Sequence, residues 1–169
     1  MPRLQEIERD AAALFRDTKY AALADGPPLP LEFLQARQRV GAVWVAATSN
    51  DDAVGFAVVF SVDGALHLHE LSVAPAYGRR GLGRRLIEAV CAAAIRDGYD
   101  RVTLSTFREI AWNGPFYRRC GFTELADDAL SPGLRDIRKK EAAAGLPLAD
   151  RTCMSRKLSR GNVLRILRE

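Results

Sequence analysis

A turn rich in glycine and arginine lies near the middle of the chain, and its residue types suit the binding of an anion. Residues 77–86 read Tyr-Gly-Arg-Arg-Gly-Leu-Gly-Arg-Arg-Leu, between an apolar, strand-like run and a long helical pattern. The first N–H groups of a helix have no partner within the helix, and the helix dipole is positive there. Glycines let the backbone approach a ligand closely, and the four arginines add side-chain charge. The turn therefore predicts a phosphate-binding site.

Two other kinds of phosphate-binding loop do not fit this segment. A P-loop requires Lys followed by Ser or Thr after its last glycine, and no such pair follows here. A dinucleotide-binding turn requires Gly-x-Gly-x-x-Gly, but Leu86 stands where the third glycine would follow Gly81 and Gly83. A third kind of Gly-rich turn fits better, because Arg-Arg-Gly-Leu-Gly follows Val73-x-Pro75.

A second stretch, Asn113–Phe122, reads Asn-Gly-Pro-Phe-Tyr-Arg-Arg-Cys-Gly-Phe. Pro115 in the first turn and Gly121 past the end predict a short helix that Asn113 caps. The Arg-Arg-Gly-Leu-Gly turn resembles the acetyl-CoA loop of the GNAT superfamily of N-acetyltransferases, and the second stretch is similar to the family's later Tyr-x-x-x-Gly-Phe motif. The family loop usually begins with Gln or Arg, whereas this chain has Gly78 at that position.

The resemblance covers roughly Ala53–Phe122 and extends to a narrower group. Residues 106–108 (Thr-Phe-Arg) and 112–117 (Trp-Asn-x-Pro-Phe-Tyr) resemble a bacterial GNAT subgroup whose members mostly have no assigned acceptor. The resemblance implies transfer of an acetyl group from acetyl-CoA to a primary amine, by direct attack in a ternary complex and without a metal. The acceptor stays open between a small-molecule amine and a protein amine.

The resemblance also implies roles for individual residues. Tyr117 would be the general acid for the CoA sulfur, and Glu70 would lie where the amine arrives and act as the base. Backbone groups at the end of the preceding strand would contact the pantetheine arm, and the N–H of Val73 would donate to the thioester carbonyl. The cofactor-binding candidates are Leu71, Ser72, Val73, Arg79, Arg80, Gly81, Leu82, Gly83, Arg84 and Asn113.

The base has several alternatives. Glu70 fits a solvent-facing carboxylate on a strand as well as it fits a catalytic base. His67, His69 and Glu109 are further candidates, although a single histidine on a strand is more often structural. A chain of water molecules could also remove the proton.

Asn113 differs in position from the asparagine that contacts the cofactor in many GNAT proteins. That asparagine lies seven residues before the tyrosine, where this chain has Ile110. Asn113 lies four residues before Tyr117, so capping of the short helix is the alternative role.

The strand-like run Leu66–Val73 changes phase within its length. Its first two leucines alternate on one face, whereas Leu71 and Val73 are apolar at odd positions. A β-bulge near Glu70 would produce this slip. GNAT proteins carry such a bulge, which splays two strands and leaves backbone groups free for the pantetheine. An edge irregularity without a ligand is the alternative.

Hydrophobic periodicity predicts the elements that position these residues. The predicted helices are Leu4–Asp17, Leu31–Val40, 81 or 82 to 96, the short helix after Asn113, and 131–144, with a loop at 18–30. The predicted strands are Val43–Ala47, Val54–Val62, Leu66–Val73, Arg101–Thr106 (parallel to the strand before it), Phe122–Leu125 and Arg151–Leu158, with a hairpin turn at Asp63-Gly64.

These elements predict an α/β fold of the GNAT kind, a central, mixed and mostly antiparallel sheet that helices flank and a bulge near residue 70 splays. GNAT domains usually begin with a strand, but only three residues precede the first predicted helix. That edge strand is therefore expected to be missing or to lie upstream.

Composition sets the size and setting of the protein. The 169 residues, 48% of them hydrophobic, suffice for one core, and we expect a single GNAT domain at 1–158 and a basic tail at 159–169. No apolar run reaches transmembrane length and the N-terminus lacks a signal-peptide pattern, so we expect a cytoplasmic protein without a membrane partner. The three cysteines have no metal-site spacing, and we expect them to be small buried side chains.

The net charge of +4 is unevenly distributed. Residues 151–169 hold six Lys or Arg and one Glu, whereas the other 150 residues hold 19 basic and 20 acidic side chains. Such a tail could touch nucleic acid, but a solvated tail is the favoured interpretation. The expected partners are acetyl-CoA and the amine acceptor, and the resemblance allows a homodimer because many GNAT proteins are dimers.

Two other functions fit the same fold. The acyl donor could be another acyl-CoA, such as succinyl- or propionyl-CoA. The chain could also be a non-catalytic, CoA-binding regulatory domain.

Overall fold

The computed structural model describes residues 1–159 and has an α/β fold. Its strands are β1 (Val43–Ala47), β2 (Ala53–Val62), β3 (Ala65–Val73), β4 (Arg101–Phe107), β5 (Thr123–Glu124) and β6 (Arg151–Lys157). Its α-helices are α1 (Pro2–Ala12), α2 (Leu31–Arg39), α3 (Leu82–Arg96), α4 (Gly114–Arg119) and α5 (Pro132–Ala143). Its 3-10 helices are η1 (Ala13–Phe15), η2 (Ala21–Asp25), η3 (Pro75–Tyr77), η4 (Asp127–Ala129) and η5 (Leu148–Asp150).

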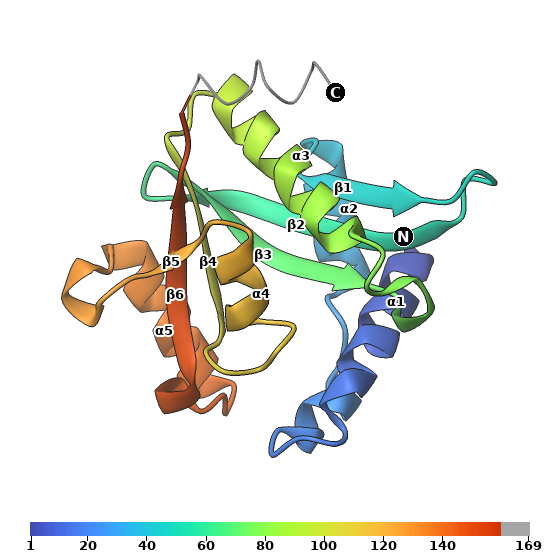
Figure 1. Ribbon diagram of the computed structural model, residues 1–169, viewed down its shortest axis with the longest axis horizontal. Helices are drawn as coiled ribbons and strands as arrows, with labels where there is room; N and C mark the ends of the chain where they lie inside the picture. Colours follow the sequence, from blue (N-terminus) through green and yellow to red (C-terminus); the bar gives the residue numbers. More distant parts are fainter. Residues whose placement is uncertain (160–169) are drawn as a thin grey trace. The chain divides into compact units, whose positions relative to one another are not determined.

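The strands form one mixed sheet with helices flanking it. Their hydrogen-bonded order is β1-β2-β3-β4-β6-β5, and Figure 1 follows the elements along the chain by colour. This arrangement confirms the predicted α/β class with a central mixed sheet.

The chain divides into two compact units. One comprises Met1–Val59 and Glu70–Val90, and the other comprises Phe60–His69 and the chain from Cys91 onward. The single domain at 1–158 stays a prediction. The predicted basic tail lies, except for residue 159, outside the described residues.

Helices α1 and α2 pack on strand β2 in the first unit. Leu4 and Ile7, spaced to share one face of α1, join Leu34 of α2 in a buried cluster with Phe56 and Val58 of β2. Burying side chains of this kind stabilises the fold by roughly 1.5–3 kcal/mol each. Strand β1 extends this part of the sheet as an antiparallel neighbour of β2.

The first helix ends earlier than the predicted Leu4–Asp17, because the chain tightens into η1 and then leaves helical geometry. The hydroxyl of Thr18 donates to the carbonyl of Phe15 at 2.7 Å and accepts from the N–H of Tyr20 at 3.1 Å. Such local side-chain bonds compete with continued helix. The segment 18–30, predicted to be a loop, contains the short helix η2.

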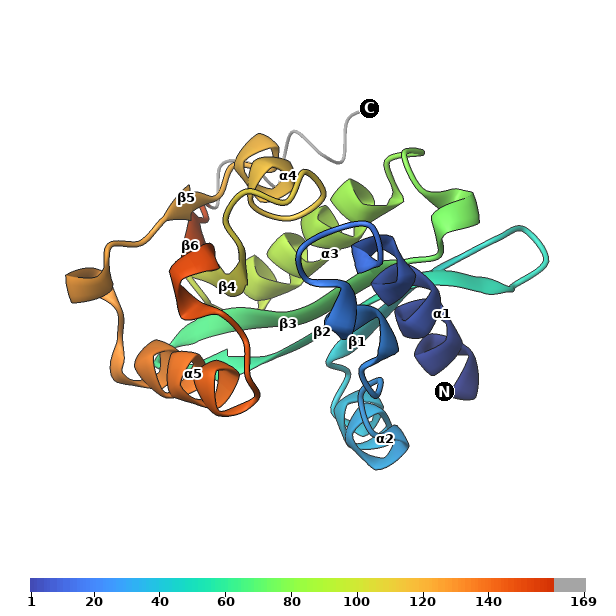
Figure 2. The same ribbon diagram turned by 90° about the horizontal axis from the view of Figure 1, so that it is seen from below.

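The second unit is built around β4 and β6. Strand β4 is parallel to β3, as predicted, over the pairs from Leu66 and Val102 to Leu68 and Leu104. Strand β6 pairs antiparallel with β4 along its whole length and with β5 on its other side. Helix α5 lies beside β6 (Figure 2), and its Leu134 joins Leu130 and, from β6, Cys153 in a small buried cluster. The bulge near residue 70 stays a prediction.

Candidate functional site

The turn between β3 and α3 has the features of an anion cradle. Gly81 adopts φ +79°, a left-handed conformation that favours glycine, and a side chain there would meet open space. Helix α3 begins at the next residue, and its first hydrogen bond runs from the N–H of Arg85 to the carbonyl of Gly81. Three backbone N–H groups precede that bond at the positive end of the helix dipole, those of Leu82, Gly83 and Arg84.

Arginine side chains surround this cradle. Arg79 and Arg80 are exposed, and Arg79 also has a positive φ of 60°. The guanidinium of Arg80 lies over the ring of Tyr77, 5.3 Å from its centroid. Exposed guanidinium groups beside the N-terminal N–H groups of a helix suit the binding of phosphate, and the phosphate site stays a prediction.

The end of β3, in the same unit, carries the predicted base. The hydroxyl of Ser72, a buried residue, donates to a carboxylate oxygen of Glu70 at 2.7 Å. Strand β2 approaches this segment through Gly55. A Cβ at Gly55 would lie 3.1 Å from both the carbonyl oxygen of Ser72 and Cγ2 of Val73. The glycine therefore sets how closely β2 can approach the backbone of the predicted cofactor-binding strand.

Sequence reasoning missed a second carboxylate in this unit, Glu8 of α1. Both of its carboxylate oxygens lie within hydrogen-bond distance of the N–H of Leu29, at 3.1 and 3.0 Å. The side chain of Gln5, one turn earlier, donates to the carbonyl of Leu29 at 2.9 Å. The two side chains together hold the loop before α2 against α1.

Burial and, secondly, the negative charge of Glu70 raise the pKa of Glu8 to about 7. Two carboxylates therefore interact in the first unit, and one of them titrates near neutral pH. The sequence contained one signal for this burial. Glu8 lies four residues after Leu4 and next to Ile7, two apolar residues of the helix face that packs inward.

The predicted acid, Tyr117, lies in α4 of the second unit and is buried. Its ring makes edge contacts with Phe116 and Phe122, with centroids 5.2 and 5.8 Å apart. Only glycine fits at position 114, the first residue of α4, because a Cβ there would collide with the carbonyl of Arg108. The packing fixes the direction of the tyrosine ring.

Asn113 precedes this helix, but the predicted side-chain cap is wrong. The side chain makes no capping hydrogen bond to α4. Its amide oxygen instead accepts a hydrogen bond from the hydroxyl of Thr106 in β4, at 2.9 Å. Its Nδ2 group is buried and has no hydrogen-bond partner among the residues that the structure describes. Asn113 therefore holds a buried donor that a ligand could use.

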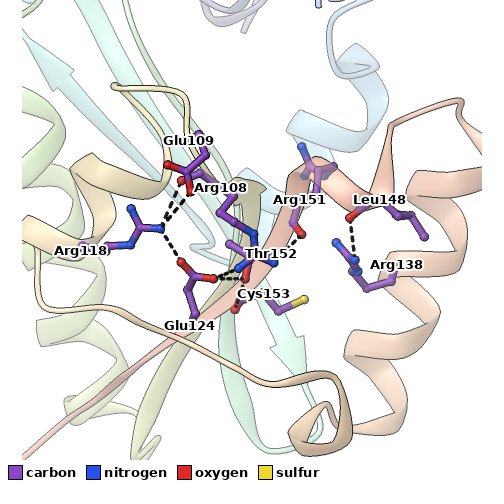
Figure 3. A network of polar contacts seen from close by, with 9 residues as sticks. All are labelled: Arg108, Glu109, Arg118, Glu124, Arg138, Leu148, Arg151, Thr152 and Cys153. Atoms are coloured by element: carbon purple, nitrogen blue, oxygen red, sulfur yellow. Dashed lines mark hydrogen bonds and ion pairs between the residues drawn. The ribbon is translucent and has the colours of Figure 1, made fainter.

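A polar network ties α4 to the strands of the second unit (Figure 3). The carboxylate of Glu124 in β5 accepts from Arg108 and from Arg118 of α4. The hydroxyl of Thr152 in β6 donates to the same carboxylate at 3.2 Å. The bond from Arg118, followed by the charge of Arg108 among other causes, lowers the pKa of Glu124. The network holds the helix that carries Tyr117.

The two histidines of β3 differ. His67 is buried, and its Nδ1 shares a hydrogen bond with Thr103 at 3.0 Å. Burial lowers the pKa of His67 to about 3, so the ring is neutral at physiological pH. These features favour a structural role over a base. His69 is exposed on the same strand.

The family of the chain follows from a comparison with known domains. A family model described as an acetyltransferase (GNAT) domain matches residues 39–124, just over half of the 169 residues. The chain belongs to the GNAT acetyltransferase family. The match includes the turn before α3 and the helix of Tyr117, whereas Glu8 lies outside it.

Solved structures share this GNAT fold. The ribosomal-protein-S18-alanine N-acetyltransferase of Escherichia coli aligns with a TM-score of 0.60 at 20% identity, over 94% of this chain and 87% of that one. The PaiA N-acetyltransferase of Thermoplasma acidophilum, solved with coenzyme A, aligns with a TM-score of 0.63 at 13% identity, over 92% and 91% of the two chains.

A third GNAT structure belongs to a longer protein. N-acetylglutamate synthase of Neisseria gonorrhoeae, solved with coenzyme A and N-acetyl-glutamate, aligns with a TM-score of 0.63 at 19% identity over 78% of this chain. The alignment spans 28% of that protein's length. At these identities the three likenesses establish the fold. Within residues 1–159, no helix is both long and apolar enough to cross a membrane.

Proposed function

We propose that this GNAT protein transfers an acetyl group from acetyl-CoA to a primary amine of its acceptor. Family membership supports acetyl transfer. The interacting carboxylates of Glu8 and Glu70 support an acceptor that arrives as a cation, as an amine does near neutral pH. Acetyl-CoA supplies the acetyl group as a thioester, and the residues of the chain bind it and move protons.

The turn before α3 would hold the pyrophosphate of CoA. Its backbone N–H groups and arginine side chains form the positive cradle that a phosphate requires. The residues in this role are Arg79, Arg80, Gly81, Leu82, Gly83 and Arg84. The backbone of Leu71, Ser72 and Val73 would bind the pantetheine arm, and the buried Nδ2 of Asn113 would donate to a carbonyl or hydroxyl of the cofactor.

Glu70 would remove the proton that keeps the amine unreactive. A free amine has a pKa of about 10.4 and is mostly charged at neutral pH. The hydroxyl of Ser72 orients the Glu70 carboxylate, and Glu8 adds negative charge that attracts the ammonium ion. The deprotonated nitrogen can then form a bond to the acetyl carbon.

Two donors would assist as the C–S bond breaks. The N–H of Val73 donates to the carbonyl oxygen, where negative charge grows in the transition state. Tyr117 donates its phenolic proton to the leaving sulfur and regains a proton from solvent. The match of the family model to residues 39–124, which include both donors, carries the proposal.

Release of free thiol from acetyl-CoA against a panel of primary amines tests the proposal. Tyr117→Phe should lower turnover by about 10²–10⁴-fold, the usual contribution of a general acid. Binding of CoA, measured by calorimetry, should be unchanged because the ring contacts remain. Tyr99→Phe, at the turn before β4, is the matched control and should keep full activity.

Turnover with succinyl- or propionyl-CoA but none with acetyl-CoA would contradict acetyl transfer and show that the protein uses another acyl-CoA. Tight binding of CoA without turnover on any amine, small or protein-borne, would contradict catalysis and favour a regulatory domain.

A further inference from the structure

A cluster of charged side chains lies in the second unit, between α5 and the strands β4 and β6. Glu141 of α5 forms an ion pair with Arg151 of β6, with Oε1 and Nη2 2.7 Å apart. The guanidinium of Arg151 also stacks on Phe107 at 4.7 Å from the ring centroid and approaches the hydroxyl of Ser105 at 3.4 Å. Arg138 lies one turn before Glu141 on α5.

This ion pair is largely shielded from solvent, and its hydrogen bonding is incomplete. The side chains of Arg151 and Glu141 are only 10% and 12% exposed. Nevertheless, Nε of Arg151, Oε2 of Glu141 and Nη1 of Arg138 are buried without a hydrogen-bond partner among the described residues. Buried polar atoms in folded proteins are almost always paired, so three such atoms in one cluster require an explanation.

The planar geometry of a guanidinium group explains why Nε of Arg151 and Oε2 of Glu141 are unpaired together. Nε and Nη2 of an arginine lie on one edge, which normally grips both oxygens of a carboxylate. The exposed pairs Arg96–Asp97 and Arg101–Asp100 both show this two-bond grip. Arg151 forms only one of its two bonds to Glu141. The Nε donor of Arg151 and the Oε2 acceptor of Glu141 therefore lie on either side of the hydrogen bond from Nη2 to Oε1.

A group placed beside that bond must both accept and donate. A hydroxyl does so, because its oxygen can accept from Nε–H of Arg151 while its proton is donated to Oε2 of Glu141. The free Nη1–H of Arg138 needs an acceptor as well. Its Nη2 is already bound to the carbonyl of Leu148 at 3.0 Å, which fixes the guanidinium in place (Figure 3).

The charge of the cluster favours an anion. The charges of Arg138, Glu141 and Arg151 all act on the thiol of Cys153. The cluster therefore holds two guanidinium groups and one carboxylate and carries one net positive charge. The cluster lies close to His69 of β3, because the charge of Glu141 acts on the His69 ring. His69 is exposed, so the cluster lies next to the surface at this point of β3.

We propose that Arg138, Glu141 and Arg151 form a binding site for a small hydroxycarboxylate. The hydroxyl of the ligand bridges Arg151 and Glu141, and its carboxylate accepts from Arg138. The site is separate from the acetyl-transfer proposal, because none of its residues has a role in that reaction. Binding alone therefore tests it.

Calorimetric titration with glycolate and with acetate, at matched ionic strength, is the direct experiment. The two anions share a carboxylate, and only glycolate has the hydroxyl. Glycolate should bind about tenfold more tightly than acetate, the effect of one well-made hydrogen bond. Equal affinity of the protein for glycolate and acetate, or no heat of binding from either anion, would overturn the proposal. Water molecules would then account for the unpaired polar atoms of the cluster.

Two variants and one control locate the binding. Glu141→Gln, which exchanges one carboxylate oxygen for an amide, should remove most of the preference for glycolate over acetate. Arg138→Gln leaves the Arg151–Glu141 pair intact and should weaken the binding of both anions. This variant keeps the test valid if Glu141→Gln does not fold. Asp136→Asn, which breaks an exposed pair with Lys139 on the same helix, should change neither affinity. Unchanged glycolate binding in folded Arg138→Gln would contradict the site.

Discussion

The hydroxyl of Thr106 in β4 donates a hydrogen bond to the side-chain oxygen of Asn113, seven residues later in the chain. This bond orients the amide and leaves its NH2 group as a buried donor without a partner among the described residues. A buried donor that is unpaired in the free protein gains a full hydrogen bond when a ligand supplies an acceptor. We therefore propose that Asn113 donates a hydrogen bond to the cofactor from the second unit.

Asn113→Ala should weaken CoA binding by about fivefold, the value of one hydrogen bond. Thr106→Val should have a smaller effect in the same direction, because the amide remains but loses its orienting partner. Calorimetric titration with CoA measures both affinities. Asn50→Ala, in an exposed turn, is the control. If Asn113→Ala binds CoA as tightly as the wild type, the side chain has no contact with the cofactor.

Gly55→Ala should disturb the end of β3. The new Cβ would lie 3.1 Å from the Ser72 carbonyl and from Cγ2 of Val73, closer than ordinary van der Waals contact. We expect a loss of about 1 kcal/mol in the free energy of unfolding, typical of mild overpacking. Urea denaturation measures this loss, and the KM for acetyl-CoA should rise in the same variant. An unchanged KM would indicate that the backbone of Ser72 and Val73 does not contact the cofactor.

Glu8 should make stability depend on pH between about 4.5 and 7. Burial and the charge of Glu70 raise the pKa of this carboxyl to about 7, so in this window the folded state binds more protons than the unfolded state. Stability therefore falls as the pH rises through the window and the buried group becomes charged. Relative to wild type, Glu8→Gln should gain stability on going from acidic to mildly alkaline buffer.

Denaturation curves at several pH values measure the difference between wild type and Glu8→Gln. Glu6→Gln, in an exposed pair with Arg3 on the same helix, is the control and should change stability little at any pH. A constant difference between wild type and Glu8→Gln across the window would show that Glu8 does not titrate there.

Glu124→Gln should loosen the attachment of α4. The carboxylate is bound by Arg108, Arg118 and Thr152, and their hydrogen bonds and charges lower its pKa. The stabilisation is therefore present above the unfolded pKa and is lost as the pH falls through the lower folded value. We expect Glu124→Gln to cost about 1 kcal/mol near neutral pH and little in strong acid.

Thermal unfolding of Glu124→Gln against Glu109→Gln isolates this network. Glu109 also lies near Arg118, at 3.8 Å, but its side chain is 79% exposed. Its substitution should change stability by less than about 0.5 kcal/mol. Equal losses in the two variants would mean that the charge near Arg118, and not the geometry around Glu124, stabilises α4.

Local patterns in the sequence predicted most of the fold. Asp63 and Gly64 were predicted to turn between two strands, and both have the positive φ that a tight hairpin requires. Hydrophobic periodicity predicted α3 with the ends that the structure has. In both cases residues close in sequence determine the structure, so the sequence alone contains the information.

The missed features depend on residues that are distant in sequence. Glu8 titrates near neutral pH because the folded chain buries its carboxyl and brings the charge of Glu70 close to it. Asn113 was predicted to cap α4, since its position is right for a cap, but Thr106 of another element takes its side chain. Propensity rules describe local alternatives, and tertiary contacts override them.

All three cysteines of the chain are buried as free thiols. Burial raises the pKa of the Cys153 thiol, and a thiol that stays protonated reacts slowly with alkylating reagents. A single cysteine introduced on an exposed helix face would therefore take up a maleimide dye or a spin label ahead of the native thiols. Fluorescence or electron-spin distance measurements could then follow the protein in solution without first removing its natural cysteines.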